Sequence, residues 1–324
     1  MTEGRYVIGL DLGGTNSVFG IVDATGNIVA ETSIKTQGHG SNPQQYVDDC
    51  MVELRKIIDS VGGIKNIRAR GIGAPNANYY TGCINMAPNL PWKEESIPLA
   101  KMFSEALGVP VTMTNDANAA AIGEMTYGAA KGMKNFIMIT LGTGVGSGIV
   151  VNGQLVYGSD GLAGELGHVI VEKNGRMCGC GRKGCLETYC SSTGVARTAR
   201  EIITSTDTPT LLRDIPLDKI ESKDVSIAAE KGDKVAKQIF ETTGRILGEA
   251  CADFATFCSP EAFIFFGGLT NAGDLIMNPI KHAYEESVLP IYRGKAKMLV
   301  SQLDGAKAAV LGASALGWEI NNKI

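Results

Sequence analysis

The chain has 324 residues, of which 44% are hydrophobic and 20% charged, and its formal net charge at pH 7 is -4. A single hydrophobic core rarely grows beyond about 250 to 300 residues, so this length predicts two lobes. The slightly acidic charge balance gives no indication of nucleic-acid binding, which requires clustered basic residues.

The N-terminal segment MTEGRYVIGLDLGG does not have the composition of a signal peptide, because charged residues interrupt its apolar run. Residues 135–159 carry no charge, a length that could in principle cross a bilayer. Six glycines and Asn152 within that stretch argue against a spanning helix, which needs sustained apolarity. We therefore expect a cytoplasmic protein with neither a membrane nor a nucleic-acid partner.

The chain contains eight cysteines, and in a reducing compartment these are not expected to form a disulfide framework. Cys50, Cys251 and Cys258 fit the apolar faces of expected helices. A buried free thiol is the plainer interpretation at these three positions.

Three β runs open the chain, YVIGLDLGG, SVFGIVD and NIVAE, and Gly-rich turns such as residues 24–27 separate them. They predict an antiparallel β-meander. A helix is then expected from Pro43 to Val61, where apolar residues recur at helical spacing, followed by strands at IRARGIGAP and VPVTMTN.

The same plan recurs at FIMITLGTG, VGSGIVVNG and QLVYG, so the chain looks internally duplicated. A long helix over residues 235–257 then leads into the buried strand AFIFFGG, and this alternation of strands and helices indicates an α/β protein. We expect an N-terminal lobe at 1–117, to which a C-terminal helix at 305–324 returns, and a larger lobe at 118–304.

Two glycine loops occupy equivalent places in the two copies, DLGGT at 11–15 and LGTGVG at 141–146. Neither matches the P-loop or the dinucleotide fingerprint, and each alone could be only a tight turn. As a pair they favour a nucleotide whose phosphates lie between two loops of backbone N–H groups, with Asp11 orienting a hydrated Mg²⁺. The expected fold is the two-lobed actin-like (ribonuclease H-like) ATPase fold with duplicated βββαβα units and a zinc loop.

Cys178, Cys180 and Cys185 lie within eight positions, and His168 precedes them. A Cys₃His set suits tetrahedral Zn²⁺, and four protein ligands leave no open position for a catalytic water, so such a metal would be structural. The spacing Cys-x-Cys-x₄-Cys is unusual for a zinc ribbon, however, and a single upstream His is more often a satisfied core residue. On the residues alone, both interpretations stay open.

Segments along almost the whole chain resemble the ROK family (repressors, open reading frames, kinases). They are DLGGT, APNL at 87–90, NDANAAA at 115–121, the second glycine loop, ELGH at 165–168, CGCGRKGCLE at 178–187 and FGGL at 266–269. The repressors of this family place a helix-turn-helix before the DxGGT strand, and only ten residues precede Asp11 here. The resemblance therefore implies a sugar kinase.

The resemblance implies that Asp116 is the general base for the sugar 6-hydroxyl, although Asn115 and Asp116 could also be an ordinary helix N-cap pair. It implies zinc ligands at His168, Cys178, Cys180 and Cys185, and sugar contacts at Asn89, Asn115, Asp116, Glu165, His168 and Glu187. The nucleotide and its phosphates are expected at Asp11, which would hold Mg²⁺ through water, and at Gly13, Gly14, Thr15, Gly142, Thr143, Gly144, Gly267 and Gly268.

One loop departs from the family pattern. Many members have Gly after the Pro of GxxxP, whereas Pro75 is followed here by Asn76, and Asn78 comes two residues later. The family pattern therefore gives no expectation for this loop in sugar selectivity.

The leading hypothesis is an ATP-dependent hexokinase that converts glucose to glucose 6-phosphate, with structural Zn²⁺ and with Mg²⁺ bound to ATP. Kinases for N-acetylglucosamine, N-acetylmannosamine, mannose or allose are alternatives, as are a non-catalytic sugar-responsive regulator and a zinc-stabilised interaction module. The resemblance also suggests a homodimer.

Overall fold

The computed structural model describes residues 4–86, 90–92, 94–303 and 307–320. The chain forms two compact units. One consists of Met1–Gly132, Gln154–Gly164 and Gln302–Ile324, and the other of Met133–Gly153 and Glu165–Ser301.

The first unit is built on a five-stranded sheet with the order β3-β2-β1-β4-β7. Its strands are β1 (Tyr6–Leu12), β2 (Asn16–Asp23), β3 (Ile28–Lys35), β4 (Ile67–Gly73) and β7 (Val111–Thr114). β2 pairs antiparallel with both β1 and β3, which confirms the predicted meander. β4 runs parallel to β1, and β7 runs parallel to β4, so these three strands end at the same edge of the sheet.

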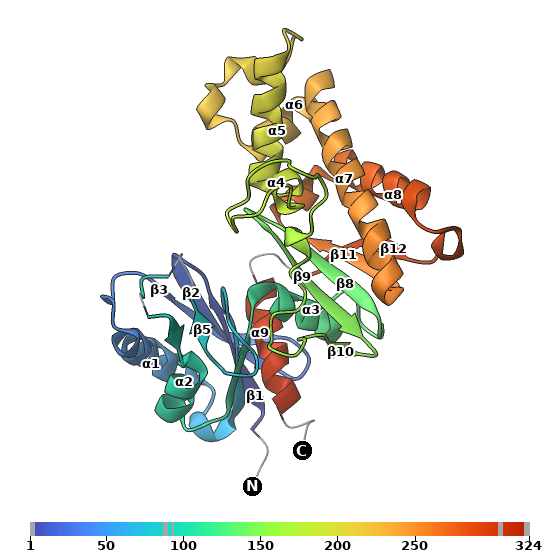
Figure 1. Cartoon of the computed structure of the whole chain (residues 1–324). Coiled ribbons are helices and arrows are strands. Elements are labelled where there is room, and N and C mark those ends of the chain that lie inside the picture. The colour runs from blue at the N-terminus through green and yellow to red at the C-terminus, as the bar shows by residue number, and fades with distance from the viewer. Residues whose placement is uncertain (1–3, 87–89, 93, 304–306, 321–324) are drawn as a thin grey trace. The chain divides into compact units, whose positions relative to one another are not determined.

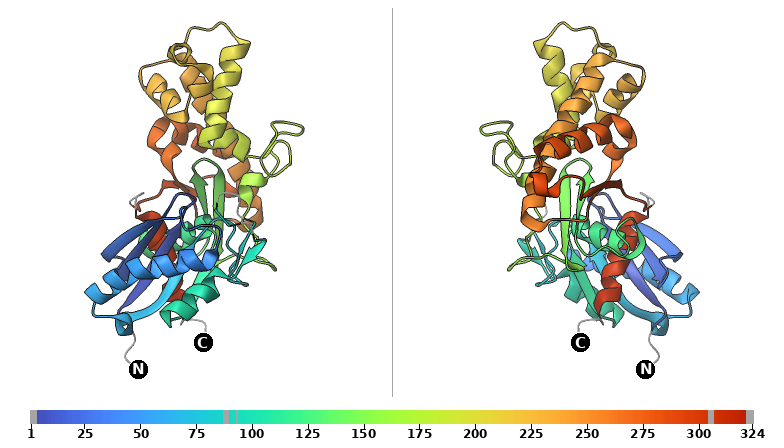
Figure 2. Two further views of the ribbon diagram at one scale, coloured as in Figure 1. Left: turned by 90° about the vertical axis from the view of Figure 1, so that its left-hand side faces the viewer. Right: turned by 90° about the vertical axis from the view of Figure 1, so that its right-hand side faces the viewer.

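Helices cover both faces of this sheet, and the alternation of side chains along β1 assigns each helix to a face. Ile8 and Leu10 pack with α1 (Pro43–Ser60) and α2 (Leu99–Leu107), whereas Val7 packs with α9 (Ala308–Glu319). Helix α3 (Asp116–Tyr127) lies against α9. These layers can be followed in Figures 1 and 2. The unit also contains the short strands β5 (Ile84–Asn85), β6 (Ser96–Ile97) and β10 (Gln154–Leu155).

Glycines let α9 approach β4 and α3 more closely than other residues would allow. A Cβ atom on Gly71 of β4 would overlap the carbonyl oxygen of Ala313 in α9. A Cβ atom on Gly312 of α9 would overlap the carbonyl oxygen of Ala119 in α3. The backbones are therefore in direct contact at these two places, where only glycine fits.

The lobe boundary at residues 117 and 118 stays a prediction, and the compact units divide the chain differently. Residues 118–132 and 154–164 belong to the first unit. Residues 118–132 belong to the first unit because α3 packs on α9, and α9 packs on β1 and β4 of the first sheet. Of the C-terminal helix expected over 305–324, residues 308–319 are helical, and residues 304–306 and 321–324 lie outside the described residues.

The second unit contains strands in the order β9-β8-β11-β12. They are β8 (Phe136–Leu141), β9 (Val145–Val151), β11 (Ala262–Phe266) and β12 (Lys297–Val300). β8 pairs antiparallel with β9, and β11 is parallel to both β8 and β12. The helices are α4 (Glu187–Cys190), α5 (Ser192–Ser205), α6 (Ser222–Glu230), α7 (Lys234–Cys258) and α8 (Asp274–Ser287).

The core of this unit joins alternate residues of the central strands to the long helix α7. Ile137 and Ile139 of β8 and Phe263 and Phe265 of β11 are buried in one cluster with residues of α7 and α8. Helices α7 and α8 lie side by side, as Figure 1 shows. The bounds of α7 agree with the helix predicted over residues 235–257.

In each unit an antiparallel strand pair is followed by two strands parallel to the first of that pair, β4 and β7 in one and β11 and β12 in the other. This likeness is compatible with internal duplication, which stays a prediction. Cys50 and Cys251 are buried free thiols as expected, whereas Cys258, at the end of α7, is only half-buried. Within the described residues, no helix is long and apolar enough to cross a membrane.

Arg70 on β4 is fully buried among the apolar residues that join the sheet to α2. Its guanidinium carbon lies 3.7 Å from the ring centroid of Phe103 and 5.2 Å from that of Phe19. None of its three side-chain nitrogens has a hydrogen-bond partner in the part of the chain that the structure describes. Burial lowers the pKa of Arg70 to about 10, so the group stays charged at neutral pH and interacts mainly with the faces of aromatic rings.

We expect Arg70→Lys to destabilise the protein by about 1 to 3 kcal/mol, because an ammonium group is more strongly hydrated and cannot stack as a plane. Arg70→Met should be neutral or stabilising by about 1 kcal/mol, since it removes a buried charge without leaving an ionic partner unpaired. Urea unfolding at neutral pH measures both differences. A larger loss for Met than for Lys would contradict this expectation, because it would show that the buried charge itself stabilises the fold.

Candidate active site and metal centre

The residues predicted to form the site divide between the two units. The first unit contains Asp11, Gly13, Gly14, Thr15, Asn115 and Asp116. The second contains Gly142, Thr143, Gly144, Glu165, His168, Cys178, Cys180, Cys185, Glu187, Gly267 and Gly268. Asn89 lies outside the described residues.

Two of the predicted carboxylates meet at the edge of the first sheet where β1, β4 and β7 end. Asp11 is in register with Gly73 of β4, which in turn is in register with Thr114 of β7. Helix α3 begins at Asp116, directly after β7 and the cap residue. A Cβ atom on Gly73 would lie 4.0 Å from the Cα atom of Asp116, so the sheet edge brings Asp116 to the neighbourhood of Asp11.

The pKa of Asp11 is shifted by this arrangement. Burial of its carboxyl group, and after it the charge of Asp116, raise the pKa of Asp11 to about 6. A carboxylate whose pKa is raised by burial together with a specific neighbouring charge is typical of functional sites.

Asn115 and Asp116 do form the N-terminal cap that was the alternative interpretation of this pair. The side chain of Asn115 accepts a hydrogen bond from Asn118 N at 2.7 Å, and Oδ1 of Asp116 accepts one from Ala117 N at 2.8 Å. Capping fixes both side chains at the start of α3. A fixed carboxylate is compatible with a catalytic role, so the cap does not decide between the two interpretations.

Each glycine loop is a tight turn closed by its own backbone. Gly13 N donates to Asn16 O at 3.0 Å in the first loop, and Gly142 N donates to Gly144 O at 3.0 Å in the second. In the second unit, β8 and β11 are parallel, so their carboxyl ends meet. Gly267 follows β11 with φ of 113°, and a Cβ atom there would overlap the backbone of Leu141. The structure thus brings Gly267 to the start of the second glycine loop.

The four predicted zinc ligands lie together in the second unit. One donor atom from each of His168, Cys178, Cys180 and Cys185 lies within 4.8 Å of the donors of the others. The separations are 3.7 Å between Cys178 Sγ and His168 Nδ1 and 3.7 Å between the sulfurs of Cys180 and Cys185. Sulfurs bound to one tetrahedral Zn²⁺ lie about 3.8 Å apart, as Zn–S distances of about 2.3 Å require. The donor set therefore fits zinc in both chemistry and spacing.

The three thiols differ in acidity. Burial raises the pKa of Cys178 to about 12, whereas a hydrogen bond from the backbone of Arg182 lowers the pKa of Cys180. A metal ion binds thiolates, so loading of this cluster would release the protons that the thiols hold at neutral pH.

Glu187 connects the cysteine cluster to the second glycine loop. Its Oε2 accepts a hydrogen bond from Val145 N at 3.0 Å, and Cys178 Sγ lies 3.7 Å from its Oε1. A Cβ atom on Gly144 would overlap the same carboxylate. Glycine at 144 therefore makes room for Glu187.

The segment ELGH forms a turn of 3₁₀ helix over Leu166–His168, with Glu165 as its N-terminal flanking residue. His168 N donates to Glu165 O at 3.1 Å, and Leu166 N donates to Ser147 Oγ of β9 at 3.1 Å. A side chain on Gly167 would collide with Val145 O. This turn is therefore packed directly on β9.

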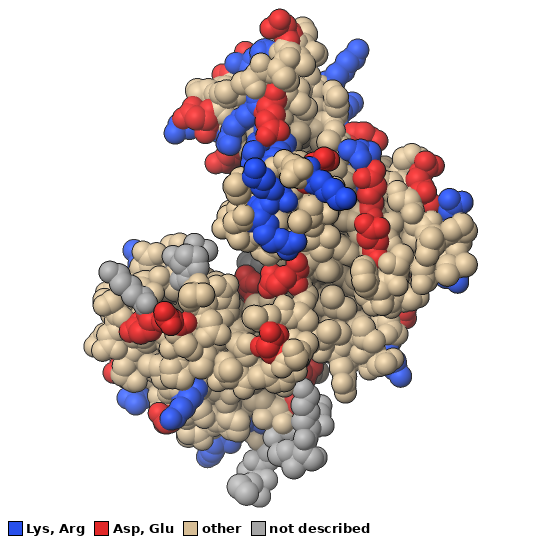
Figure 3. Space-filling view, viewed as in Figure 1, with Lys and Arg blue, Asp and Glu red and all other residues tan. Residues whose placement is uncertain are grey.

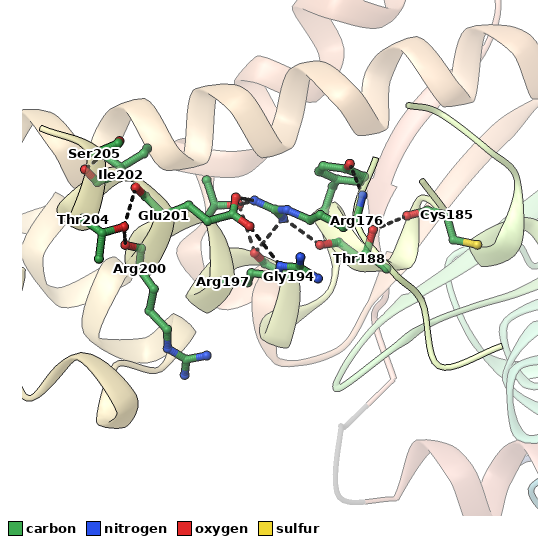
Figure 4. A network of polar contacts seen from close by, with 12 residues as sticks. Arg176, Cys185, Thr188, Gly194, Arg197, Arg200, Glu201, Ile202, Thr204 and Ser205 are labelled. Atoms are coloured by element: carbon green, nitrogen blue, oxygen red, sulfur yellow. Dashed lines mark hydrogen bonds and ion pairs between the residues drawn. The ribbon is translucent and has the colours of Figure 1, made fainter. Parts of the chain in front are cut away.

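Arg176 connects the cysteine segment, residues 176–185, to α4 and α5, as Figure 4 shows. Its Nη1 donates to Thr188 O at 2.7 Å, and its Nη2 donates to Thr198 Oγ1 at 2.9 Å and to Glu201 Oε2 at 2.5 Å. Thr188 in turn donates its hydroxyl to the carbonyl oxygen of Cys185, one of the four predicted ligands, at 2.7 Å. The Arg176 side chain is only 9% exposed, so this network is a largely buried connection between the cysteine segment and the two helices.

Asn76 and Asn78, the departure from the family pattern, both organise backbone in the first unit. Asn76 adopts φ of 53°, and its amide donates to Met86 O at 2.9 Å. Asn78 is buried, donates to Asp160 O at 2.6 Å and accepts from the backbone N–H of Tyr80. These contacts assign Asn78 a structural role in its loop.

Several polar groups around the loops are absent from the sequence-based prediction. Ser192 N donates to Gly142 O at 2.8 Å, and Thr193 Oγ1 donates to Thr143 O at 2.9 Å, so the start of α5 holds the second loop. Thr36 Oγ1 makes the corresponding contact with Gly13 O in the first loop. None of these residues belongs to a motif, and no signal in the sequence alone would have identified them.

Basic side chains gather in Figure 3 over the part of the second unit where Figure 1 places α4 and the cysteine segment. This segment supplies Arg182 and Lys183, both exposed.

A profile of the ROK family matches residues 7–319. The glucokinase of Streptomyces coelicolor is 37% identical over 321 residues, which cover 96% of this chain and 97% of that protein. The crystal structure of a ROK family glucokinase from Streptomyces griseus in complex with glucose and AMPPNP matches with a TM-score of 0.78 and 36% identity, over 97% of this chain and 99% of the other. A ROK family transcriptional regulator, a homologue of the E. coli MLC protein, matches with a TM-score of 0.84 and 26% identity, over 97% of this chain and 77% of the regulator.

The chain belongs to the ROK family. The proteins that match include both glucokinases and transcriptional regulators. The similarity to several glucokinases over almost the whole chain supports an ATP-dependent hexokinase.

The Asp11 carboxylate is expected to weaken the fold in the absence of ligands. Its pKa of about 6 in the folded chain exceeds the ordinary value of 3.8, so its ionisation with rising pH costs folding free energy. Asp11→Asn should therefore raise the free energy of unfolding by about 2 to 3 kcal/mol near pH 7.5 in EDTA. The gain should shrink as the pH falls through 6 and vanish below about 4. Urea unfolding across this range tests the prediction, with exposed Asp48→Asn as the control; an equal gain at all pH values would contradict it.

Arg176→Met is expected to weaken zinc binding about 10- to 100-fold, because residues that support metal ligands commonly contribute that much to metal affinity. The measurement is competition for Zn²⁺ against a colorimetric chelator. Arg197 bonds the same Glu201 at 2.9 Å but lies on α5, outside the cysteine segment, so Arg197→Met is the matched control. Equal zinc affinities for the wild type and Arg176→Met would show that the metal alone organises the segment.

Proposed function

We propose that this ATP-dependent hexokinase transfers the γ-phosphoryl group of ATP to the 6-hydroxyl of glucose, with Asp116 as the general base. The observation that carries the proposal is the position of Asp116, which is fixed at the start of α3 beside the half-buried carboxylate of Asp11. Relatives that share the fold and about a third of the sequence are glucokinases, and one was solved with glucose and an ATP analogue.

In this proposal Asp116 accepts the hydroxyl proton as the sugar oxygen attacks the γ-phosphorus and the bond to the bridging oxygen of ADP breaks. General base catalysis contributes about 10² to 10⁴-fold. Because phosphoryl transfer passes through a loose transition state, most of the remaining acceleration comes from positioning and charge stabilisation. The glycine loops at 11–15 and 141–146, with Gly267 and Gly268, would hold the nucleotide.

Asp11 is proposed to hold Mg²⁺ through a water molecule. Carboxylate oxygens suit this hard cation. The raised pKa of Asp11 also fits, since burial and the charge of Asp116 both disfavour an ionised group that has no cation beside it. When bound with ATP, Mg²⁺ would neutralise charge on the phosphates.

Zn²⁺ is proposed to be structural, held by His168, Cys178, Cys180 and Cys185. Because Nδ1 of His168 faces Cys178, Nε2 is the ring nitrogen that would meet a sugar hydroxyl. The cluster would thereby position His168 together with Glu165 and Glu187, which lie within three residues of ligands in the sequence. Asn89, Asn115 and Asp116 would complete the sugar contacts.

A second candidate is a sugar-responsive regulator of the same family, favoured by the structural match to a transcriptional regulator. The pairing of Asp11 with Asp116 destabilises the ligand-free fold. Catalysis gives a reason for keeping such a pair, whereas a regulator has no need of it. Among kinases, N-acetylglucosamine, N-acetylmannosamine, mannose and allose are the alternative substrates. A cytoplasmic homodimer is the proposed state of the enzyme.

The test is ADP release from Mg-ATP with glucose and a panel of hexoses and N-acetylhexosamines. We expect turnover to be fastest with glucose, and Asp116→Ala to lower kcat about 10² to 10⁴-fold, because only the transition state needs the base. The affinity for Mg-AMPPNP should stay within about threefold, since Asp116 is assigned to the acceptor side.

The matched control is Asp48→Ala, which removes an exposed carboxylate of α1 and should leave kcat unchanged. Absence of turnover with every sugar, while zinc and sugar still bind, would favour the regulator. Faster turnover on another hexose would correct the substrate alone.

A further inference from the structure

A chain of buried hydroxyl groups runs from α1 to the first glycine loop. Tyr46 on α1, Ser17 on β2 and Thr36 just after β3 are all 0% exposed. Tyr46 OH lies 2.7 Å from Ser17 Oγ, Ser17 Oγ lies 2.8 Å from Thr36 Oγ1, and Thr36 Oγ1 lies 2.6 Å from Gly13 O.

The direction of this chain follows from counting protons. A carbonyl oxygen only accepts, so Thr36 must donate its single hydroxyl proton to Gly13 O. Ser17 therefore donates to Thr36, and Tyr46 donates to Ser17. Three O–H groups thus point the same way and end on one carbonyl of the loop, an arrangement in which each bond strengthens the next.

The other carbonyls of this loop are held from the same side of the turn. Gln37 Nε2 donates to Gly14 O at 3.2 Å, and Thr36 N donates to Thr15 O at 2.9 Å. In a planar trans peptide the C=O of one residue and the N–H of the next point in opposite directions. With the carbonyls of Gly13 and Gly14 turned toward residues 36–37, the N–H groups of Gly14 and Thr15 point away from them.

We propose that Thr36, supported by Ser17 and Tyr46, is a positioning residue that presents the N–H groups of Gly14 and Thr15 to the phosphates of the nucleotide. This inference rests on the proposed function, in which the first glycine loop binds those phosphates. Thr36 touches neither substrate in it. Its effect is to fix two peptide planes before the nucleotide arrives, so that binding does not have to order them.

The plainer interpretation is that the three hydroxyls only satisfy one another in the core. The two interpretations differ in what they predict for function. A purely structural chain would affect stability and leave the relative affinities for nucleotide and sugar unchanged, whereas a positioning chain acts selectively on the nucleotide.

The experiment compares Thr36→Val, Thr36→Ser and Tyr46→Phe by isothermal titration calorimetry with Mg-AMPPNP and by the KM values for Mg-ATP and for sugar. Thr36→Val keeps the shape but removes the hydroxyl, and should raise the Kd for Mg-AMPPNP roughly tenfold, as loss of a buried hydrogen bond suggests. Thr36→Ser restores the hydroxyl and should recover most of this loss. Tyr46→Phe removes only the far end of the chain, and a smaller loss of about threefold is expected.

Two buried hydroxyls of the second unit serve as controls. Thr243 is 1% exposed, as is Tyr284, and the side-chain oxygen of neither has a hydrogen-bond partner within the described residues. Thr243→Val and Tyr284→Phe should leave the Kd for Mg-AMPPNP unchanged. The KM for sugar should stay within about twofold in every variant, since none of the altered groups is assigned to the sugar.

Unchanged nucleotide affinity in Thr36→Val, or equal losses for nucleotide and sugar, would overturn the positioning role while leaving the proposed kinase intact. If Thr36→Val does not fold, Tyr46→Phe decides by the same criteria, because it too removes a hydroxyl of the chain. Failure of the wild-type protein to bind Mg-AMPPNP would instead overturn the proposed function, so the two failures are distinguishable.

Discussion

The direct contact of helix backbones with the first sheet is the constraint on which the candidate catalytic geometry depends. Glycine at 71 lets α9 lie directly on β4, and glycine at 312 lets α3 lie directly on α9. Bulkier residues at either position would push α3 away from the sheet. Since Asp116 is the first residue of α3, the same packing brings its carboxylate to the edge where β1 presents Asp11. Two charges that are distant in sequence thus become neighbours through contacts that carry no charge at all.

The proximity of Asp11 and Asp116 opposes folding and favours the binding of a cation, because like charges repel each other and attract a positive ion. Burial and the charge of Asp116 raise the pKa of Asp11, so an ionised pair destabilises the ligand-free fold at neutral pH. A divalent cation beside Asp11 would reverse the balance, because it favours the ionised form of that carboxylate. Catalytic sites commonly retain such unfavourable arrangements, and stability has to come from elsewhere in the structure. In the first unit it comes from the apolar clusters on the two faces of the sheet.

The parts of the structure that the sequence predicted are those that a local pattern marks. Helix α1 begins at Pro43 because Asn42 caps it, and α3 begins at Asp116 because Asn115 does the same. The cysteine cluster was recognisable because its ligands are chemically distinctive and closely spaced. Thr36 and Arg176 were not recognisable, because their roles depend on partners that tertiary packing supplies. A threonine after a strand and an arginine in a polar loop look like ordinary surface residues until the fold buries them.

The two glycine loops are held by the same kind of hydrogen bond, although the donor comes from a different element in each. In each loop a threonine hydroxyl donates to a loop carbonyl, Thr36 to Gly13 in the first and Thr193 to Thr143 in the second. When a loop carbonyl is hydrogen-bonded on one side of the turn, the N–H of the next residue points to the opposite side. N–H groups that point outward together are what an anion-binding site needs. The loops differ in what stands behind them. The first loop is supported by a buried hydroxyl chain. In the second, Val145 N donates to Glu187, whose carboxylate also lies 3.7 Å from the sulfur of Cys178. Glu187 therefore links the second loop to the cysteine cluster. If zinc binds the cluster and the loop binds phosphate as proposed, a metal with a closed set of ligands would still influence the phosphate site through this single carboxylate.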